Sequence, residues 1–300
     1  MTKVINQSSG KNWTMYHGDC CEVVAGLPDE SVGFSVFSPP FSSLFVYSNS
    51  EHDMGNSRSD AQFMEHFKFL VGELYRVTKP GREVAFHCAN VPAMKERDGY
   101  MGLKHLRGHL IEAFIAGGFV LHSEHVIWKD PLIEATRTKS LGLMHKQLLK
   151  DSTRCRAGIP DYLIAVRKPG ENKEPVAHEG GLCEFVGENA PVGGVQSHEI
   201  WRRYASPVWR DMVTKFDEIV PTLSPAQLEV FAQLLKFQFD FDDDSSPAWM
   251  DINQSNTLQK ASARDEKDEL HVCPLQLDVI ARALVLWSNP GDVVMTPFAG

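Results

Sequence analysis

A buried strand that stops at two prolines is the strongest constraint on how this chain folds. Residues 31–37, SVGFSVF, are mostly small, β-branched and aromatic, which predicts a strand buried on both faces. Pro39 and Pro40 follow Ser38, and neither can continue a ladder because proline has no N–H. The strand therefore ends in bare carbonyl oxygens, with the Ser38 hydroxyl before them and the Phe41 ring after them. Open α/β sheets bind their ligands at such carboxyl ends.

The four residues Ser38 to Phe41 offer groups that suit the exocyclic amino group of a nucleobase. The nitrogen of such a group is conjugated with the ring and is a weak nucleophile. The Ser38 oxygen and the Pro39 carbonyl can accept its two hydrogens and turn the lone pair outward. Phe41 can stack on a base that has left the duplex. The alternative is an ordinary Pro-Pro turn without a chemical role.

Strand and helix patterns alternate through the first half of the chain. A short strand at 15–17 leads to Asp19, which is either a helix cap or an acceptor for a ligand amino group. Asp60 is expected to cap an amphipathic helix that ends at Lys79-Pro80-Gly81. Further strands are expected at 83–88, 119–128 and 162–167, with a helix at 103–116. This alternation predicts an α/β fold, with a mostly parallel sheet and helices on both faces.

Composition limits the class of protein. The 300 residues contain 43% hydrophobic residues, which is typical of a globular chain with a sizeable core. Six cysteines without a CxxC pair indicate reduced thiols, so a cytoplasmic location is expected. Residues 1–10 lack the apolar segment of a signal peptide, and no apolar run is long enough to span a membrane. The net charge of −9 argues against a nucleic-acid coat protein, although local fields matter more for an enzyme.

One segment is basic despite the acidic total. Between residues 137 and 168 there are eight lysines and arginines but only two acids, Asp151 and Asp161. Cations and amides mixed in this way suit phosphate contacts with a few base contacts. The alternative is a solvated helix face. The candidate DNA contacts are Arg137, Lys139, Lys146, Lys150, Arg154 and Arg156.

The second half of the chain is less regular. Residues 169–194 are rich in Gly, Pro and Glu and are expected to form a linker. Residues 206–212, SPVWRDM, are echoed 40 residues later as SPAWMDI, and a helix announced by Ser224-Pro225 lies between the copies. We interpret this as a small inserted unit, since one echo is not an array. Near the end, a helix precedes a turn at 289–292 and a strand at 293–295, which runs into Thr296-Pro297-Phe298-Ala299-Gly300.

Together these pieces resemble the β-class DNA amino-methyltransferases, which modify cytosine N4 or adenine N6. Ser38-Pro39-Pro40-Phe41 resembles the catalytic motif IV, (D/N/S)PP(Y/F/W), and Gly18-Asp19 resembles motif III. Residues 271–275, HVCPL, resemble motif X. Residues 289–300 resemble the approach to motif I, usually D-P-F-x-G-x-G, with Thr296 in place of the Asp and with the pattern followed only to its first glycine. The motif order is that of the β class.

The resemblance implies a Rossmann-like S-adenosylmethionine-dependent methyltransferase sheet in circularly permuted order, with an inserted target-recognition region. It implies a catalytic α/β part at 1–168, target recognition with a small helical insert at 169–262, and the start of the cofactor-binding part at 263–300. The catalytic residues would be Ser38, Pro39, Pro40 and Phe41. S-adenosyl-L-methionine would be held by Asp19, His271, Pro274, Pro297, Phe298, Ala299 and Gly300.

The implied activity is methyl transfer to a flipped base of double-stranded DNA. Ser38 at the first motif position favours cytosine N4 over adenine N6. The setting would be a restriction-modification system or a phage. No metal is expected, because His87 and Cys88 lack a suitably spaced pair of partner ligands. Three alternatives stay open: an inactive DNA-binding remnant, one subunit of a split enzyme completed by a second chain or a homodimer, and methylation of RNA or a protein amide.

Overall fold

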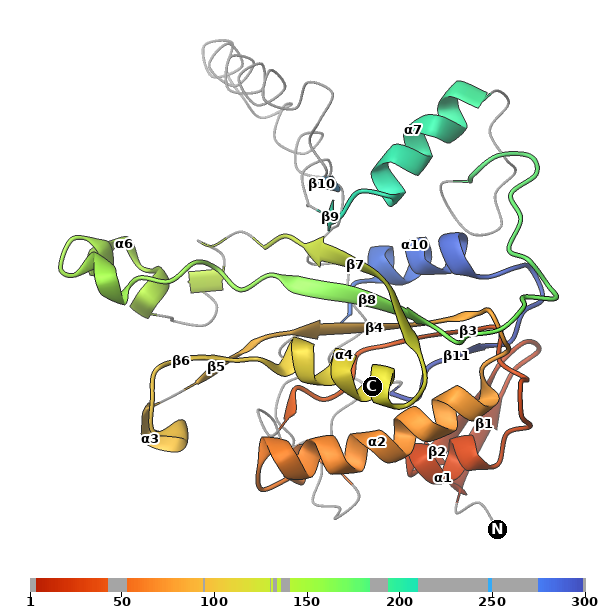
Figure 1. Cartoon of the computed structure of the whole chain (residues 1–300), viewed down its shortest axis with the longest axis horizontal. Helices are drawn as coiled ribbons and strands as arrows, with labels where there is room; N and C mark the ends of the chain where they lie inside the picture. Colours follow the sequence, from red (N-terminus) through yellow and green to blue (C-terminus); the bar gives the residue numbers. More distant parts are fainter. Residues whose placement is uncertain are drawn as a thin grey trace.

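The structure is a computed structural model that describes residues 4–42, 53–93, 95–129, 131, 134–135, 141–183, 194–209, 248–249 and 275–298. The chain folds as an α/β protein around a seven-stranded mixed sheet with the order β10-β9-β7-β8-β4-β3-β11 (Figure 1). The sheet strands are β3 (Phe34–Phe37), β4 (Glu83–Ala89), β7 (Val120–Ile127), β8 (Asp161–Arg167), β9 (Val208–Trp209), β10 (Ala248–Trp249) and β11 (Val294–Met295).

The centre of the sheet joins parallel and antiparallel pairs. β11, β3 and β4 are parallel neighbours, and β8 runs antiparallel between β4 and β7. β9 and β10 continue the sheet in parallel beyond β7. The last described strand of the chain therefore lies beside β3, the earliest strand of this sheet.

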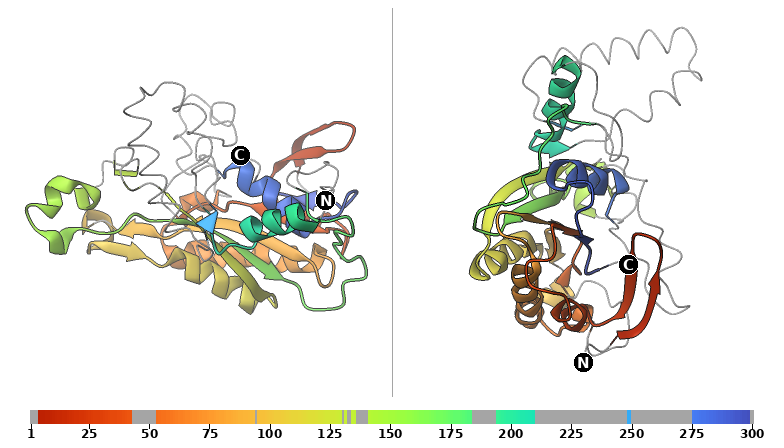
Figure 2. Two further views of the ribbon diagram at one scale, coloured as in Figure 1. Left: turned by 90° about the horizontal axis from the view of Figure 1, so that it is seen from above. Right: turned by 90° about the vertical axis from the view of Figure 1, so that its right-hand side faces the viewer.

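Helices cover both faces of the sheet, as the two views of Figure 2 also show. On one face lie α1 (Cys20–Ala25), α2 (Asp60–Val77) and α4 (Leu106–Ala116), around a core rich in phenylalanine. On the other face, α10 (Leu277–Trp287) and the C-terminal half of α7 (Gly194–Tyr204) share a hydrophobic core with Phe34, Leu163 and Ala165. The prediction of an α/β sheet with helices on both faces is confirmed, whereas the permuted order and the domain boundaries stay predictions.

The helix α2 shows how sequence sets these elements. Its six buried residues, among them Phe63, Phe67 and Leu74, recur at helical spacing and face the sheet. The Ser59 hydroxyl accepts a hydrogen bond from the Gln62 N–H at 3.2 Å, so the cap is Ser59 and not Asp60 as expected. Asp60 instead occupies the first turn, where its charge suits the helix dipole.

Several small elements lie outside the expected pattern. β1 (Val4–Ser9) and β2 (Thr14–Gly18) form a separate antiparallel hairpin, so the strand before Asp19 is not part of the main sheet. β5 (Val91–Ala93) and β6 (Gly102–Lys104) form a short antiparallel ribbon, and β6 includes residues 103–104, which were expected to begin a helix. The remaining elements are α3 (Lys95–Asp98), α6 (His145–Leu148), η2 (Met54–Asn56), η3 (Leu141–Leu143) and η4 (Ser152–Arg154).

Two residues from each of the echoed segments lie side by side in the described part of the chain. Val208 pairs with Ala248 and Trp209 with Trp249, so equivalent positions of the two copies are neighbours in parallel strands. Parallel neighbours require a connection of a dozen or more residues, and 38 residues separate β9 from β10 in the sequence. The expected helix at Ser224-Pro225 lies outside the described residues. None of the helices that the structure describes combines the length and hydrophobicity needed to cross a membrane.

Candidate active site at the carboxyl edge of the sheet

Several strand ends meet at one edge of the sheet. The parallel strands β11, β3, β4 and β7 all end there, and the antiparallel β8 begins there. The helix that follows β3, α2, covers one face, and the helix that precedes β11, α10, covers the other. The gap between the ends of β3 and β11 is therefore a topological switch point, where open sheets bind their ligands.

Ser38, Pro39 and Pro40 occupy this edge, directly after β3. Ser38 and Pro40 are half-buried, and Pro39 is buried. The Ser38 Oγ lies 3.1 Å from His87 Nδ1, at the end of the neighbouring strand β4. The Pro40 carbonyl accepts a hydrogen bond from the Ser42 N–H at 2.9 Å. The Pro39 carbonyl accepts none from the described part of the chain, which leaves it able to accept one from a ligand.

Ser42 holds the end of this turn. Its φ of 56° lies in the left-handed region, which a serine rarely adopts. Its hydroxyl donates to Asp60 Oδ1 at 2.5 Å, so the turn is tied to the first residue of α2. Asp60 is held in turn by Lys104, whose Nζ lies 3.2 Å from Oδ2. The backbone after Pro40 is thus anchored on two further elements, as positioned site residues require.

Phe41 packs inward in this structure. It is 6% exposed, belongs to the core between the sheet and α2, and its ring centre lies 5.9 Å from that of His87. The ring is therefore next to the Ser38–His87 pair, but core neighbours cover it. Its stacking on a base stays a prediction, and this role requires the ring to be uncovered.

A buried charged cluster lies behind Ser38. His87 Nε2 lies 3.0 Å from Asp161 Oδ2, but at an angle too oblique for a hydrogen bond. Lys129 Nζ lies 2.6 Å from Asp161 Oδ1. Both His87 and Asp161 are at least 99% buried. Burial by itself would raise the pKa of Asp161, but the charges of Lys129 and His87 outweigh burial and lower it to about 2.

Sequence reasoning missed this cluster. The sequence presents His87 only as a candidate metal ligand and Asp161 only as an acid within the basic segment. The available signal was the presence of ionisable residues inside otherwise apolar strands, EVAFHCA and DYLIAVR, because buried ionisable groups are paired. Which residues pair, however, depends on β8 lying between β4 and β7.

The structure describes three of the residues expected to hold the cofactor. Phe298 and Pro297 follow β11 and are half-buried, and the Phe298 ring centre lies 5.8 Å from that of Phe37, the residue before Ser38. The two segments that resemble motif I and motif IV are therefore neighbours. The remaining candidates His271, Pro274, Ala299 and Gly300 lie outside the described residues.

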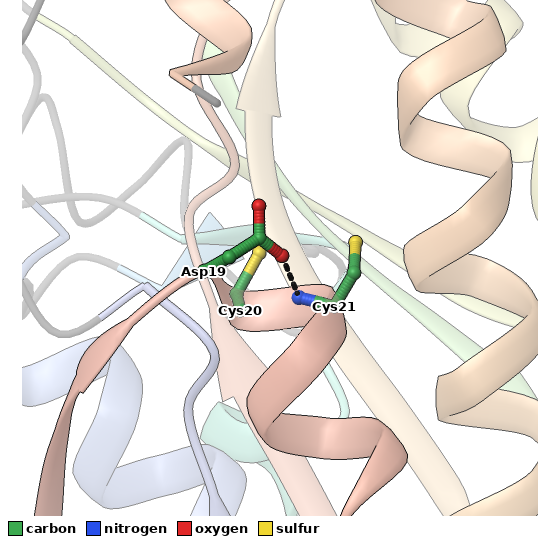
Figure 3. Close-up of side chains that lie close together, drawn as sticks. All are labelled: Asp19, Cys20 and Cys21. Atoms are coloured by element: carbon green, nitrogen blue, oxygen red, sulfur yellow. Dashed lines mark hydrogen bonds between the residues drawn. The ribbon is translucent and has the colours of Figure 1, made fainter. Parts of the chain in front are cut away.

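Asp19 caps α1. Its Oδ1 accepts a hydrogen bond from the N–H group of Cys21 at 2.8 Å (Figure 3). The same oxygen accepts a second hydrogen bond, from the N–H group of Glu22 at 3.1 Å. The cap interpretation is confirmed, and contact with a cofactor stays a prediction. Asp19, Cys20 and Cys21 bring one ligand atom each within 4.8 Å of one another. However, the hydrogen bond with Cys21 and burial raise the pKa of the Cys20 thiol, which disfavours the thiolate that a metal needs.

The candidate DNA contacts lie on an excursion between β7 and β8. Lys146, Lys150 and Arg154 are exposed on α6, the turn after it and η4, and Figure 1 shows α6 beyond the ends of β7 and β8. Arg156 is half-buried, with Nη2 at 3.4 Å from the buried Glu134, so part of its charge is neutralised within the fold. Arg137 and Lys139 lie outside the described residues.

Two bases of the basic segment face away from this excursion. Arg167 and Lys168 lie at the opposite end of β8, where the Lys168 Nζ donates to the Thr78 carbonyl at 2.8 Å and Arg167 Nε to the Gly81 carbonyl at 3.1 Å. These two residues stabilise the fold, and the exposed bases of this segment that the structure describes, Lys146, Lys150 and Arg154, lie on the side of the carboxyl edge.

No protein-family model matches the sequence, and no curated protein matches it. Among solved structures, the chain is similar to TTHA0409 of Thermus thermophilus, provisionally named a DNA modification methylase and complexed with S-adenosyl-L-methionine. The identity is 18% and the TM-score 0.49, over 94% of this chain and 77% of that one.

Two further structures are similar at lower TM-scores. The M1.HpyAVI–SAM complex is 12% identical with a TM-score of 0.36, over 95% of this chain and 80% of that one. The PvuII DNA methyltransferase (cytosine-N4-specific) is 19% identical with a TM-score of 0.38, over 54% and 52%. At these identities the activity of this chain has to be argued from its own residues.

Proposed function

We propose that this chain is an S-adenosylmethionine-dependent methyltransferase that modifies the exocyclic amino group of a flipped base in double-stranded DNA, with cytosine N4 favoured over adenine N6. One observation carries the proposal: two acceptors, the Ser38 oxygen and the Pro39 carbonyl, follow β3 at the carboxyl edge of the sheet. They lie at the switch point between β3 and β11, where ligands of open sheets bind.

The two acceptors suit an amino group because such a group has two hydrogens to donate. A base nitrogen that donates one hydrogen to the Ser38 oxygen and one to the Pro39 carbonyl is pyramidalised, and its lone pair is released from the ring. The neighbouring β11 end is then the natural position for the methyl donor. S-adenosylmethionine would supply an electrophilic methyl group there.

The residues around β11 fit such a donor in part. Phe298 presents an aromatic ring beside Phe37, and Asp19 presents a carboxylate at the start of α1, which packs against α2 and the same core. An aromatic ring and a carboxylate suit the adenine ring and the amino groups of the cofactor. We therefore assign Phe298, Pro297 and Asp19 to the side of the site that holds it.

DNA as the substrate is supported by the exposed cations of the excursion between β7 and β8. Because both strands have their site-facing ends at the carboxyl edge, Lys146, Lys150 and Arg154 extend from the edge that carries Ser38. Phosphate contacts on this excursion would position a duplex next to the site.

The test is transfer of a labelled methyl group from S-adenosylmethionine to unmethylated genomic DNA by the full chain. Ser38→Ala removes one acceptor, and we expect it to lower the rate by roughly 10²-fold, as for other positioned polar groups at a reacting centre. Pro39→Ala removes the ring that fixes φ at this residue, so the Pro39 carbonyl is held less rigidly and the rate should also fall. Pro28→Ala, at an exposed proline before the strand, is the control and should transfer at the wild-type rate.

Equal rates in Ser38→Ala, Pro39→Ala and the control would remove the catalytic assignment. Competition by unlabelled duplex DNA, RNA and protein distinguishes the substrate classes. DNA binding without any methyl transfer would instead support an inactive DNA-binding protein.

A further inference from the structure

The residues behind Ser38 form a chain of polar contacts that leads into the protein. In the sheet register, His87 lies opposite Leu163, and Asp161 lies opposite both Ala89 and Ile127. His87 and Asp161 are thus diagonal neighbours on one face of β4 and β8. Lys129 follows two residues after Ile127 and approaches Asp161 from β7. Four neighbouring strands, β3, β4, β8 and β7, thereby place Ser38, His87, Asp161 and Lys129 in a row.

The contacts favour one tautomer of the His87 imidazole. Asp161 is ionised, since its pKa is held at about 2, and its Oδ2 lies 3.0 Å from His87 Nε2. A carboxylate beside Nε2 favours the tautomer with the proton on that nitrogen. Nδ1 is then an acceptor, so the Ser38 hydroxyl donates to it at 3.1 Å. The remaining lone pairs of the Ser38 oxygen face away from His87 and can accept from a substrate.

A purely structural role explains this arrangement less well. Burying a histidine and a carboxylate is costly, and apolar residues of similar volume often stabilise a core at least as well. A His87–Asp161 pair that only joined β4 to β8 would not require a contact between His87 and Ser38. Instead, His87 directs its second nitrogen at Ser38, the member of the chain that is half-exposed at the carboxyl edge.

We propose that His87, oriented by Asp161 and Lys129, takes the Ser38 hydroxyl proton during methyl transfer, so that Ser38 can remove the surplus proton from the methylated amino group. The inference rests on the proposed function, since an amino group is the proton source. Ser38 is the catalytic residue in this scheme, and His87 and Asp161 are positioning residues that act through it.

When the base nitrogen forms its bond to the methyl carbon, the C–S bond breaks with its electron pair on sulfur, and the nitrogen then holds one proton too many. An N–H bond breaks with its pair left on the nitrogen, and the proton moves to the Ser38 oxygen. The Ser38 hydroxyl proton moves at the same time to His87 Nδ1. The resulting imidazolium is paired with Asp161 and returns the proton to water through Ser38 after the product leaves.

The other ionisable groups on this part of the sheet do not take the place of Asp161 and Lys129 beside His87. On the same face, beyond β8, lie His125 on β7 and Arg282 on α10. Burial lowers the pKa of His125, so this histidine stays neutral, and Arg282 lies over the Tyr204 ring. Cys88 and Glu124 alternate to the opposite face of the sheet, and burial raises the pKa of the Cys88 thiol. Asp161 is thus the acid, and Lys129 the cation, that act on His87.

The test is the pH dependence of single-turnover methyl transfer by the wild type and His87→Gln. Protonated His87 cannot accept from Ser38, so the wild-type rate should fall toward acid pH. His87→Gln should be roughly 10–10²-fold slower at neutral pH and lack this acid limb, with the Kd for DNA unchanged. The control is His125→Gln, another buried histidine of the same sheet, which should keep the wild-type profile.

A second measurement does not depend on activity. Nitrogen NMR of labelled histidine should show His87 with its proton on Nε2 in the wild type, and Ser38→Ala or Asp161→Asn should change the chemical shifts of its ring nitrogens. A wild-type rate and acid limb in a folded His87→Gln would overturn the relay alone, as would a proton on Nδ1. Absence of transfer by the wild type would overturn the proposed function, and the relay with it.

Discussion

The buried ion pair between Arg82 and Asp292 fixes the strand that the proposed cofactor site depends on. The Arg82 side chain is 0% exposed and that of Asp292 is 5% exposed. Arg82 Nη1 donates to the Glu174 carbonyl at 2.9 Å, and Nη2 contacts Asp292. Asp292 Oδ2 also accepts from the Asn289 N–H at 2.7 Å. The pair thus joins the start of β4 to the turn immediately before β11.

Asp292→Asn removes the negative charge while keeping the shape of the side chain. An unpaired buried ion costs about 3–5 kcal/mol. The lower end, about 3 kcal/mol, is expected because the Glu174 carbonyl still accepts from Arg82. That loss lowers Tm by roughly 6–12 °C for a chain of this order of size. The control is Asp29→Asn, which breaks the contact of Arg76 with a 74% exposed carboxylate and should cost less than about 1 kcal/mol.

Urea unfolding followed by circular dichroism measures both variants, and hydrogen exchange of the Val294 and Met295 amides reports on β11 directly. We expect faster exchange at β11 in Asp292→Asn only. Equal unfolding free energies in the two variants would refute the view that this buried pair holds the edge of the sheet.

Three further changes test other parts of the account. Phe114→Ala should cost about 3–5 kcal/mol of unfolding free energy, because its buried ring contacts Phe67, Phe86 and Phe119, whereas Ile115→Ala, at an exposed neighbour, should stay within about 0.5 kcal/mol; equal losses on urea unfolding would contradict this packing. The pKa of Asp161 is lowered from 3.8 to about 2, so its carboxylate stabilises the fold above pH 3.8 and this contribution is lost as the pH falls toward 2. Lys129→Met removes a cation that lowers this pKa, so the midpoint of acid unfolding should move to higher pH, and an unchanged midpoint would count against the pair. Lys150→Ala should weaken DNA binding and reduce the slope of log K against log salt by about 1, while Lys173→Ala, an exposed lysine away from the excursion, should leave the slope unchanged; identical slopes would remove the excursion from the DNA interface.

Local patterns predicted the elements whose burial is regular. The run before Ser38 is a buried strand and ends at the prolines, and the periodic apolar residues after Ser59 form α2. The hairpin at Val4–Ser9 and Thr14–Gly18 was only half predicted, because most of its side chains are exposed and give no alternating apolar signal.

The site was predictable only where it is contiguous in sequence. Ser38 to Phe41 could be named from their order, but the His87–Asp161 contact joins residues 74 positions apart and depends on β8 running antiparallel beside β4. The same holds for Arg82 and Asp292, whose pairing follows from the position of the last turn against the start of β4. Sequence separation hides such pairs, since a single chain shows which groups need partners but not which partners they find.

The most direct test of the central claim is nucleoside mass spectrometry of duplex DNA after incubation with the full chain and S-adenosylmethionine that bears a deuterated methyl group. We predict a labelled exocyclic amine, N4-methylcytosine in preference to N6-methyladenine, made by the wild type and strongly reduced in Ser38→Ala. Label on cytosine C5, or no labelled base from a folded wild-type chain that binds both DNA and S-adenosylmethionine, would contradict it.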